Sequence, residues 1–234
     1  MKTKLLAVFA LAAVMLLLSA GANASTIPVL FIYDTGTGNM ATVLDNDNDG
    51  IVNFTGTVGD FELTVDTGQA SPPLGVGQSD LSFVATNSFG STTSSLWIYL
   101  SILNNPNPTG GVSYLASIGG TANPPASVDW WLYTRSNNTA CDSTNALSCA
   151  LDAFTSNAIA LGAGLGGGAF SATAGGSLLP GGNPYSLVQI VGVNNLAVGE
   201  TATGDYHLAV PEPASLTLLG SGFLGLLGFF RRRK

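Results

Sequence analysis

A strict alternation of apolar and polar side chains over residues 61–67 is the feature that most limits how this chain can fold. The apolar positions are Phe61, Leu63 and Val65, and the polar positions between them are Glu62, Thr64 and Asp66. A period of two residues is typical of a β-strand with one buried face. The segment Ile51–Thr57 precedes it, and Val58-Gly59-Asp60 between the two predicts a hairpin turn.

Short apolar runs bounded by turn residues recur throughout residues 25–209 and predict further strands. They are Ile27–Tyr33, Leu81–Thr86, Leu96–Leu103, Tyr114–Ile118, Val128–Thr134, Leu187–Val193 and Tyr206–Val210. Strand geometry then places Trp130 and Trp131 on opposite faces. With the hairpin this makes nine strands, which predicts a single all-β domain of the β-sandwich or jelly-roll kind.

Two segments of this domain have alternative readings. Ala150–Gly162 is compatible with a helix or with an irregular excursion. Gly162–Gly182 is too rich in glycine to form a helix at reasonable cost. It predicts either a loop over part of the core or glycine-rich strands at a sheet edge.

The charges of residues 25–209 are almost all negative. This segment contains thirteen Asp and Glu, no Lys and a single cation, Arg135, which gives a formal net charge of −12. Such a surface repels nucleic acid and anionic lipid and tolerates cations such as calcium. We therefore expect no nucleic-acid partner.

The first 24 residues have the three parts of a secretory signal peptide. Lys2 and Lys4 are the positive start, Leu5–Leu18 is an apolar run of 14 residues, and Ala22-Asn23-Ala24 is a small-x-small cleavage site. The mature chain is then expected to begin at Ser25. Export through the Sec translocon, with cleavage by signal peptidase, follows from this pattern.

The last 25 residues combine a turn, a short apolar span and a basic end. Val210-Pro211-Glu212-Pro213 is expected to be extended and unpaired, because proline fixes φ and removes the backbone donor. Leu216–Phe230 has 15 residues without a charge, whereas a full membrane span needs about 20. The cations Arg231, Arg232, Arg233 and Lys234 are expected to stay cytoplasmic and to stop transfer. A short transmembrane helix is predicted here.

This order of parts resembles the PEP-CTERM sorting tail of exported bacterial proteins, which is also catalogued as an ice-binding-protein C-terminal motif. The resemblance implies processing by an exosortase, a membrane transpeptidase-like protease, in bacteria that make extracellular polysaccharide. The expected route is a precursor anchored in the inner membrane, followed by the cell surface or the extracellular space. An ordinary C-terminal membrane anchor is the alternative, but it leaves Pro211-Glu212-Pro213 unexplained.

An acidic loop is the candidate metal site. Asp45, Asp47 and Asp49 occupy positions 1, 3 and 5 of an EF-hand-like calcium loop, and Gly50 occupies position 6. The carbonyl of Ile51 and the side chain of Asn53 would complete the set. Position 12 is Gly56 instead of a bidentate Glu, so the loop departs from an EF-hand. The alternative is an Asp- and Asn-rich turn that leads into a strand.

The remaining reactive side chains are few. Cys141 and Cys149 are the only cysteines, and in an oxidising compartment they predict a disulfide. His207 is the only histidine, and we expect an exposed or half-buried strand residue because no Gly-x-Ser-x-Gly nucleophile motif accompanies it. A glycosidase with paired carboxylates stays open, since acids are plentiful.

Aromatic and threonine side chains offer two further surfaces. Trp97, Trp130 and Trp131 could stack on sugar rings or lie in the core. Three Thr-x-Thr pairs, at residues 35–37, 55–57 and 201–203, are similar to those of ice-binding faces. Their spacings of 20 and 146 residues argue against a regular face, so the ice-binding label is expected to apply to the tail alone.

The expected function is that of a non-enzymatic, exported protein of the cell surface or extracellular matrix. The alternative is a carbohydrate-binding or carbohydrate-active extracellular protein. Expected partners are the export machinery, the exosortase, the membrane before processing and extracellular polysaccharide. No cofactor is expected apart from calcium.

Overall fold

The computed structural model describes residues 26–67, 79–105, 112–145, 148–149, 159–179 and 181–209. The predicted signal peptide (1–24), residues 150–158 and the sorting tail (210–234) lie outside the described residues. Among the residues that are described, no helix has the length and apolar character needed to cross a membrane. The strands are β1 (Ile27–Asp34), β2 (Met40–Leu44), β3 (Phe54–Val58), β4 (Phe61–Thr67), β5 (Ser79–Asn87), β6 (Ser94–Asn105), β7 (Val112–Arg135), β8 (Ile159–Leu178), β9 (Tyr185–Leu196) and β10 (Thr201–Ala209).

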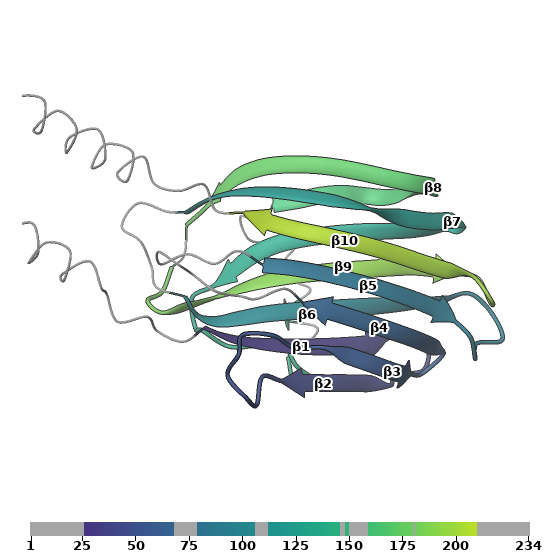
Figure 1. Ribbon diagram of the computed structural model, residues 1–234, viewed down its shortest axis with the longest axis horizontal. Helices are drawn as coiled ribbons and strands as arrows, with labels where there is room; N and C mark the ends of the chain where they lie inside the picture. Colours follow the sequence, from purple (N-terminus) through teal and green to yellow (C-terminus); the bar gives the residue numbers. More distant parts are fainter. Residues whose placement is uncertain are drawn as a thin grey trace, which may run out of the picture.

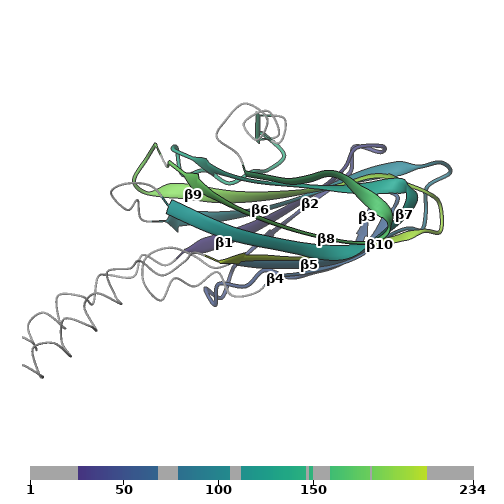
Figure 2. The same ribbon diagram turned by 90° about the horizontal axis from the view of Figure 1, so that it is seen from above.

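The strands form two antiparallel layers that are joined by β7. The hydrogen-bonded order is β2-β1-β6-β9-β7-β10-β5-β4-β3, with β8 on β7. Residues 127–135 of β7 pair with β9, whereas residues 115–122 pair with β10. Layer 1 therefore comprises β2, β1, β6, β9 and the second half of β7, and layer 2 comprises the first half of β7 with β10, β5, β4 and β3 (Figures 1 and 2). The predicted β-sandwich is confirmed.

The core fills the space between the layers because alternate residues of each strand point inward. Layer 1 contributes Leu30, Ile32, Ile98, Leu100 and Trp130, and layer 2 contributes Phe61, Leu63, Val65, Phe83 and Tyr206. The ring centroids of Trp130 and Tyr206 are 6.4 Å apart and the two ring planes are nearly parallel. This contact links the two layers directly. The phenol of Tyr206 is deeply buried, which raises its pKa above the ordinary value.

A buried polar chain also crosses the core. Trp130 Nε1 donates to Gln189 Oε1 at 3.3 Å, and Gln189 Nε2 donates to Ser79 Oγ at 2.7 Å. Gln189 is only 1% exposed, and both ends of its amide have a partner, as burial of an amide requires. The chain runs from β7 and β9 in layer 1 to β5 in layer 2.

The two long strands differ from the short ones that the sequence predicts. The predicted strands 114–118 and 128–134 are parts of one strand, β7, because residues 119–122 go on pairing with β10 and β8 and residue 127 already pairs with β8 and β9. The pairing shifts register between Ala122 and Ser127, where Pro124 and Pro125 have no N–H to donate. The glycine-rich segment is an edge strand, β8, which was the second of its two alternatives.

Candidate functional site

Six aromatic side chains gather on the outer face of layer 1, turned away from the main core. They are Phe31 and Tyr33 of β1, Trp97 and Tyr99 of β6, and Trp131 and Tyr133 of β7. Strand pairing sets them in rows. One row joins Tyr33, Trp97 and Gly192, and the next joins Phe31, Tyr99 and Ile190.

The two outer tryptophans lie against each other across β9. Their ring centroids are 5.6 Å apart and their planes differ by 7°, which is within the range of favourable aromatic pairs. The strand between them carries Gly192, and both rings lie within ordinary van der Waals distance of the position that a Cβ would take there. A Cβ at Gly192 would lie 3.5 Å from Trp131 and 3.8 Å from Trp97.

Burial divides the six rings into two groups. Phe31, Tyr99 and Tyr133 are buried, whereas Tyr33, Trp97 and Trp131 are only partly buried. We call the second group, together with Gly192, the tryptophan ledge. Burial raises the pKa of Tyr99, and the neighbouring phenol of Tyr33 adds to that effect.

A disulfide-bonded loop lies on the buried group. Cys141 and Cys149 form the predicted disulfide, with their Cα atoms 6.0 Å apart, so that prediction is confirmed. The Cys141 N–H donates to Ser101 Oγ at 3.0 Å, and Ser186 Oγ donates to the carbonyl of Thr139 at 2.9 Å. Since Ser101 and Ser186 belong to β6 and β9, these bonds hold the loop on the outer face and leave the ledge beside it.

Polar groups border the ledge on the side of β7. Asp129 lies in the same row as Gly192, and its Oδ2 accepts a hydrogen bond of 2.8 Å from Asn194 Nδ2. The other oxygen of Asp129 accepts from the N–H of Gly164 in β8. These contacts fix the orientation of the Asp129 carboxyl group and of the Asn194 amide.

The structure thus separates the three tryptophans that the sequence singled out. Trp130 is 1% exposed and belongs to the core between the layers. Trp97 and Trp131 meet on the outer face, 34 residues apart in sequence. Tyr33, which the sequence did not indicate, pairs directly with Trp97. Its period-two position on β1 is the signal that could have pointed to it.

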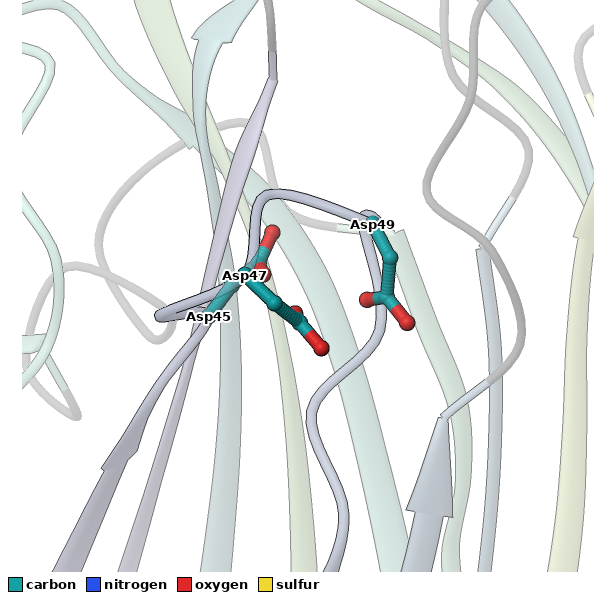
Figure 3. A group of neighbouring side chains, drawn as sticks. All are labelled: Asp45, Asp47 and Asp49. Atoms are coloured by element: carbon teal, nitrogen blue, oxygen red, sulfur yellow. The ribbon is translucent and has the colours of Figure 1, made fainter.

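The three aspartates of the acidic loop converge (Figure 3). One carboxyl oxygen from each of Asp45, Asp47 and Asp49 lies within 4.8 Å of the others. Asp45 Oδ2 accepts from the N–H of Gly50 at 3.0 Å, and Asp49 Oδ1 accepts from the N–H of Ile51 at 2.8 Å. The turn that brings them together uses Gly50 at a φ of +82°, where glycine has no steric cost.

Asn53, the other proposed side-chain ligand, has a different partner. Its Oδ1 accepts from the N–H of Thr67 at 3.1 Å, so this oxygen holds the strand that follows the loop against the end of β4. Asp45 Oδ1 is buried and has no hydrogen-bond partner. One carboxyl oxygen from each of the three aspartates is thus the part of the proposed ligand set that the structure brings within 4.8 Å.

One other acid, Asp34, is built into the loops next to the ledge. Asp34, at the end of β1, is fully buried. Its oxygens accept from the N–H of Gly36, the hydroxyl of Thr37 and the N–H of Asp60, each at 2.8 Å. Gly59 has a φ of +58°, and a Cβ there would come within 2.0 Å of Asp34. This network joins the β1–β2 loop to the β3–β4 turn and has the character of a structural brace.

His207 occupies an exposed position on β10, as the sequence predicts. Its side chain is 54% exposed and its Nδ1 contacts Asp80 Oδ1 on the neighbouring strand β5. Both residues lie on the outer face of layer 2, so the pair is a cross-strand contact at the surface.

Two of the Thr-x-Thr pairs meet on the same face, which their sequence spacing does not predict. Two rows of paired residues cross the strands in the order β3, β4, β5 and β10. The first row is Thr55, Thr64, Val84 and Thr203, and the second is Thr57, Glu62, Thr86 and Thr201. The hydroxyls of Thr86 and Thr201 are 2.8 Å apart. Val84 and Glu62 interrupt the two rows, so the threonines do not form an unbroken array.

Comparison with known proteins identifies the tail. Residues 209–234 match the model of the PEP-CTERM protein-sorting motif, which confirms the resemblance found in the sequence. The tail implies an exported protein that is anchored in the membrane before an exosortase processes it. None of the curated proteins compared matches the chain.

Several solved structures are similar to this chain at low identity. The enzymatically active domain of tailspike protein 4 from bacteriophage CBA120 is 13% identical, over 65% of this chain and 20% of its own, with a TM-score of 0.37. The adhesin domain of Epf from Streptococcus pyogenes is 10% identical, over 80% of this chain and 62% of its own, with a TM-score of 0.41. A structure of carbohydrate-binding modules from the β-sandwich superfamily is 11% identical, over 79% of this chain and 72% of its own, with a TM-score of 0.35.

Proposed function

We propose that this chain is a non-enzymatic protein of the cell surface or extracellular matrix, displayed outside the cell after its tail is processed. The observation that carries the proposal is the match of residues 209–234 to the PEP-CTERM sorting motif. The Sec translocon moves the chain across the membrane, and signal peptidase cuts between Ala24 and Ser25. An exosortase then acts at Val210-Pro211-Glu212-Pro213, while Arg231–Lys234 stay in the cytoplasm.

The position of the chain ends supports this route. β1 begins and β10 ends at the same end of the sandwich (Figure 1). The tail follows Ala209 without an intervening linker. While the tail holds the precursor in the membrane, that end of the domain faces the membrane and the opposite end points outward.

Several contacts support a non-enzymatic role. Asp34 is fully buried, and the groups around it use its oxygens in three hydrogen bonds. His207 pairs with Asp80 on an open face of the sheet. Groups held in this way stabilise loops and strands, and general acid–base chemistry would require a carboxyl group or a histidine that faces a bound substrate.

Export is tested by replacing residues 210–234 with a reporter that fluoresces only when it folds in the cytoplasm. The signal peptide should carry the fusion out of the cytoplasm, so we expect a dark reporter. Deletion of Leu5–Leu18 is the matched control and should make the same fusion bright. A bright reporter on the undeleted chain would contradict export.

We further propose that the acidic loop binds calcium weakly. Asp45, Asp47 and Asp49 bring three carboxyl groups together, and Asp45 Oδ1 has no partner within the protein. Hard cations such as calcium prefer oxygen ligands of this kind. Without a bidentate Glu, the expected dissociation constant is on the order of 0.1–1 mM, as in extracellular modules.

Calcium should raise the melting temperature of the wild-type protein, because a ligand that binds only the folded state stabilises it. Asp47→Ala should abolish the rise, since it removes one of the three ligands. Asp66→Ala, an exposed acid on β4, is the control and should keep the rise. Equal melting temperatures of the wild type with and without millimolar calcium would show that the loop does not bind calcium and is only a turn.

A further inference from the structure

We propose that the tryptophan ledge binds neutral sugar rings of a polysaccharide. The rings of the ledge are those of Tyr33, Trp97 and Trp131, which stay partly exposed on one side of a sheet. This inference rests on the proposed extracellular role for its biological setting, but the binding itself can be measured on the isolated protein.

Exposed aromatic rings are suited to the apolar face of a sugar. A pyranose ring has an apolar face of C–H groups and a rim of hydroxyls, so it packs on aromatic rings and needs hydrogen-bonding groups beside them. Large aromatic side chains bury much surface and have only two rotatable bonds, so little entropy is lost on binding. The Trp97 and Trp131 rings are already held in a near-parallel pair, 5.6 Å apart.

The fixed polar groups beside the ledge suit the hydroxyl rim. Asp129 lies in the same row as Trp97 and Gly192. Its contacts with Gly164 and Asn194 hold it in one orientation. A carboxyl group accepts hydrogen bonds from sugar hydroxyls through its remaining lone pairs. An aromatic surface with a few oriented polar groups is the usual composition of a small-molecule site.

The charge of the domain selects neutral sugars over acidic ones. Arg135 is the only cation between residues 25 and 209. It is 8% exposed, and its Nη1 donates to Cys149 Sγ at 3.1 Å beneath the disulfide loop. The ledge therefore has no positive partner for a uronic acid or a sulfate, and the net charge of −12 repels polyanions.

The ledge also lies where an anchored protein could use it. Tyr33 is the penultimate residue of β1, and Trp97 pairs with it near the start of β6. β1 begins at the end of the sandwich where β10 leads into the tail (Figure 1). The ledge is thus nearer the opposite end, which would point away from the membrane before processing.

The test is affinity electrophoresis and calorimetry of the full chain, solubilised in a detergent without a sugar headgroup. The probes are β-glucan, mannan, xylan and galactan as neutral polysaccharides, and alginate as an acidic one. We expect binding to at least one neutral polysaccharide and none to alginate. Trp97→Ala and Trp131→Ala should each weaken that binding by between about threefold and tenfold, and the double variant should not bind.

Matched variants distinguish a loss of binding caused by misfolding from a loss caused by removal of the aromatic rings. Trp97→Phe keeps an aromatic ring and should retain more affinity than Trp97→Ala. Val84→Ala removes an exposed apolar side chain from the outer face of layer 2 and should bind as the wild type does. All variants are compared by their melting temperatures.

Two results would overturn the inference: wild-type protein that binds none of the neutral polysaccharides, or a folded double variant that binds as tightly as the wild type. Either failure would leave export and tail processing untouched, since those are read from the location and mass of the protein. A failure of processing would likewise leave a positive binding result in place.

Discussion

Replacing Asp34 with alanine is expected to lower the free energy of unfolding by roughly 2–4 kcal/mol. Asp34 is fully buried at the end of β1 and accepts three hydrogen bonds of 2.8 Å, from Gly36, Thr37 and Asp60. The substitution removes all three acceptor contacts and leaves the N–H of Asp60 without this partner. The brace between the β1–β2 loop and the β3–β4 turn would be lost.

Urea unfolding followed by circular dichroism measures this loss. Asp66→Ala is the control, because Asp66 is an exposed acid on the outer face of β4, and its expected change is within about 0.5 kcal/mol. Asp34→Asn keeps one acceptor oxygen and should fall between the two. If Asp34→Ala were as stable as the control, the buried carboxyl group would not be a brace.

Replacing Pro211-Glu212-Pro213 with three alanines is expected to abolish release from the membrane. Proline restricts φ and lacks a backbone N–H, so the sequence predicts that this stretch does not add to the edge of the sheet. Alanine would remove both effects and is the best helix former. The substitution would therefore favour one helix that begins near residue 211 and continues through the apolar segment 216–230. Full-length protein should then accumulate in the membrane fraction.

Two further changes to the tail should alter the fate of the protein in different ways. Replacing Arg231–Lys234 with serine removes the stop signal, so some unprocessed protein should pass through the membrane. Deleting residues 216–234 removes the apolar span and should release a folded, soluble domain, because β10 ends at Ala209. If the triple-alanine variant were released at the wild-type rate in a host with the matching exosortase, Pro211-Glu212-Pro213 would not be the processing signal. The tail would then be an ordinary membrane anchor.

Local patterns were sufficient for the parts of the fold that depend on local rules. The alternation over Phe61–Thr67 predicted β4 with its bounds, because one face is buried and the other is not. The two halves of β7 were predicted as separate strands, since Gly119, Gly120 and the prolines at 124 and 125 interrupt the apolar pattern. What keeps β7 continuous is pairing with β8 and β10, and no local window contains that information.

The candidate sites show the same limit. The acidic loop and the cysteine pair are contiguous or nearly so, and the sequence indicated both. The tryptophan ledge joins β1, β6 and β7, and only the strand order places Tyr33 beside Trp97 and brings Trp131 over Gly192. The threonine rows likewise join Thr57 to Thr201 through two intervening strands. Spacing along the chain says nothing about register between distant strands.

Intact mass spectrometry of the protein recovered from the cell surface and from the medium tests the central proposal most directly. We predict a chain that begins at Ser25, has lost Arg231–Lys234 with the apolar span, and ends at or near Val210-Pro211-Glu212-Pro213, with the mass of any group added there. The mass should also be two hydrogens lower than that of the thiol form, because Cys141 and Cys149 are joined. A mature protein that still carries Arg231–Lys234, or one found only inside the cell, would contradict export and exosortase processing.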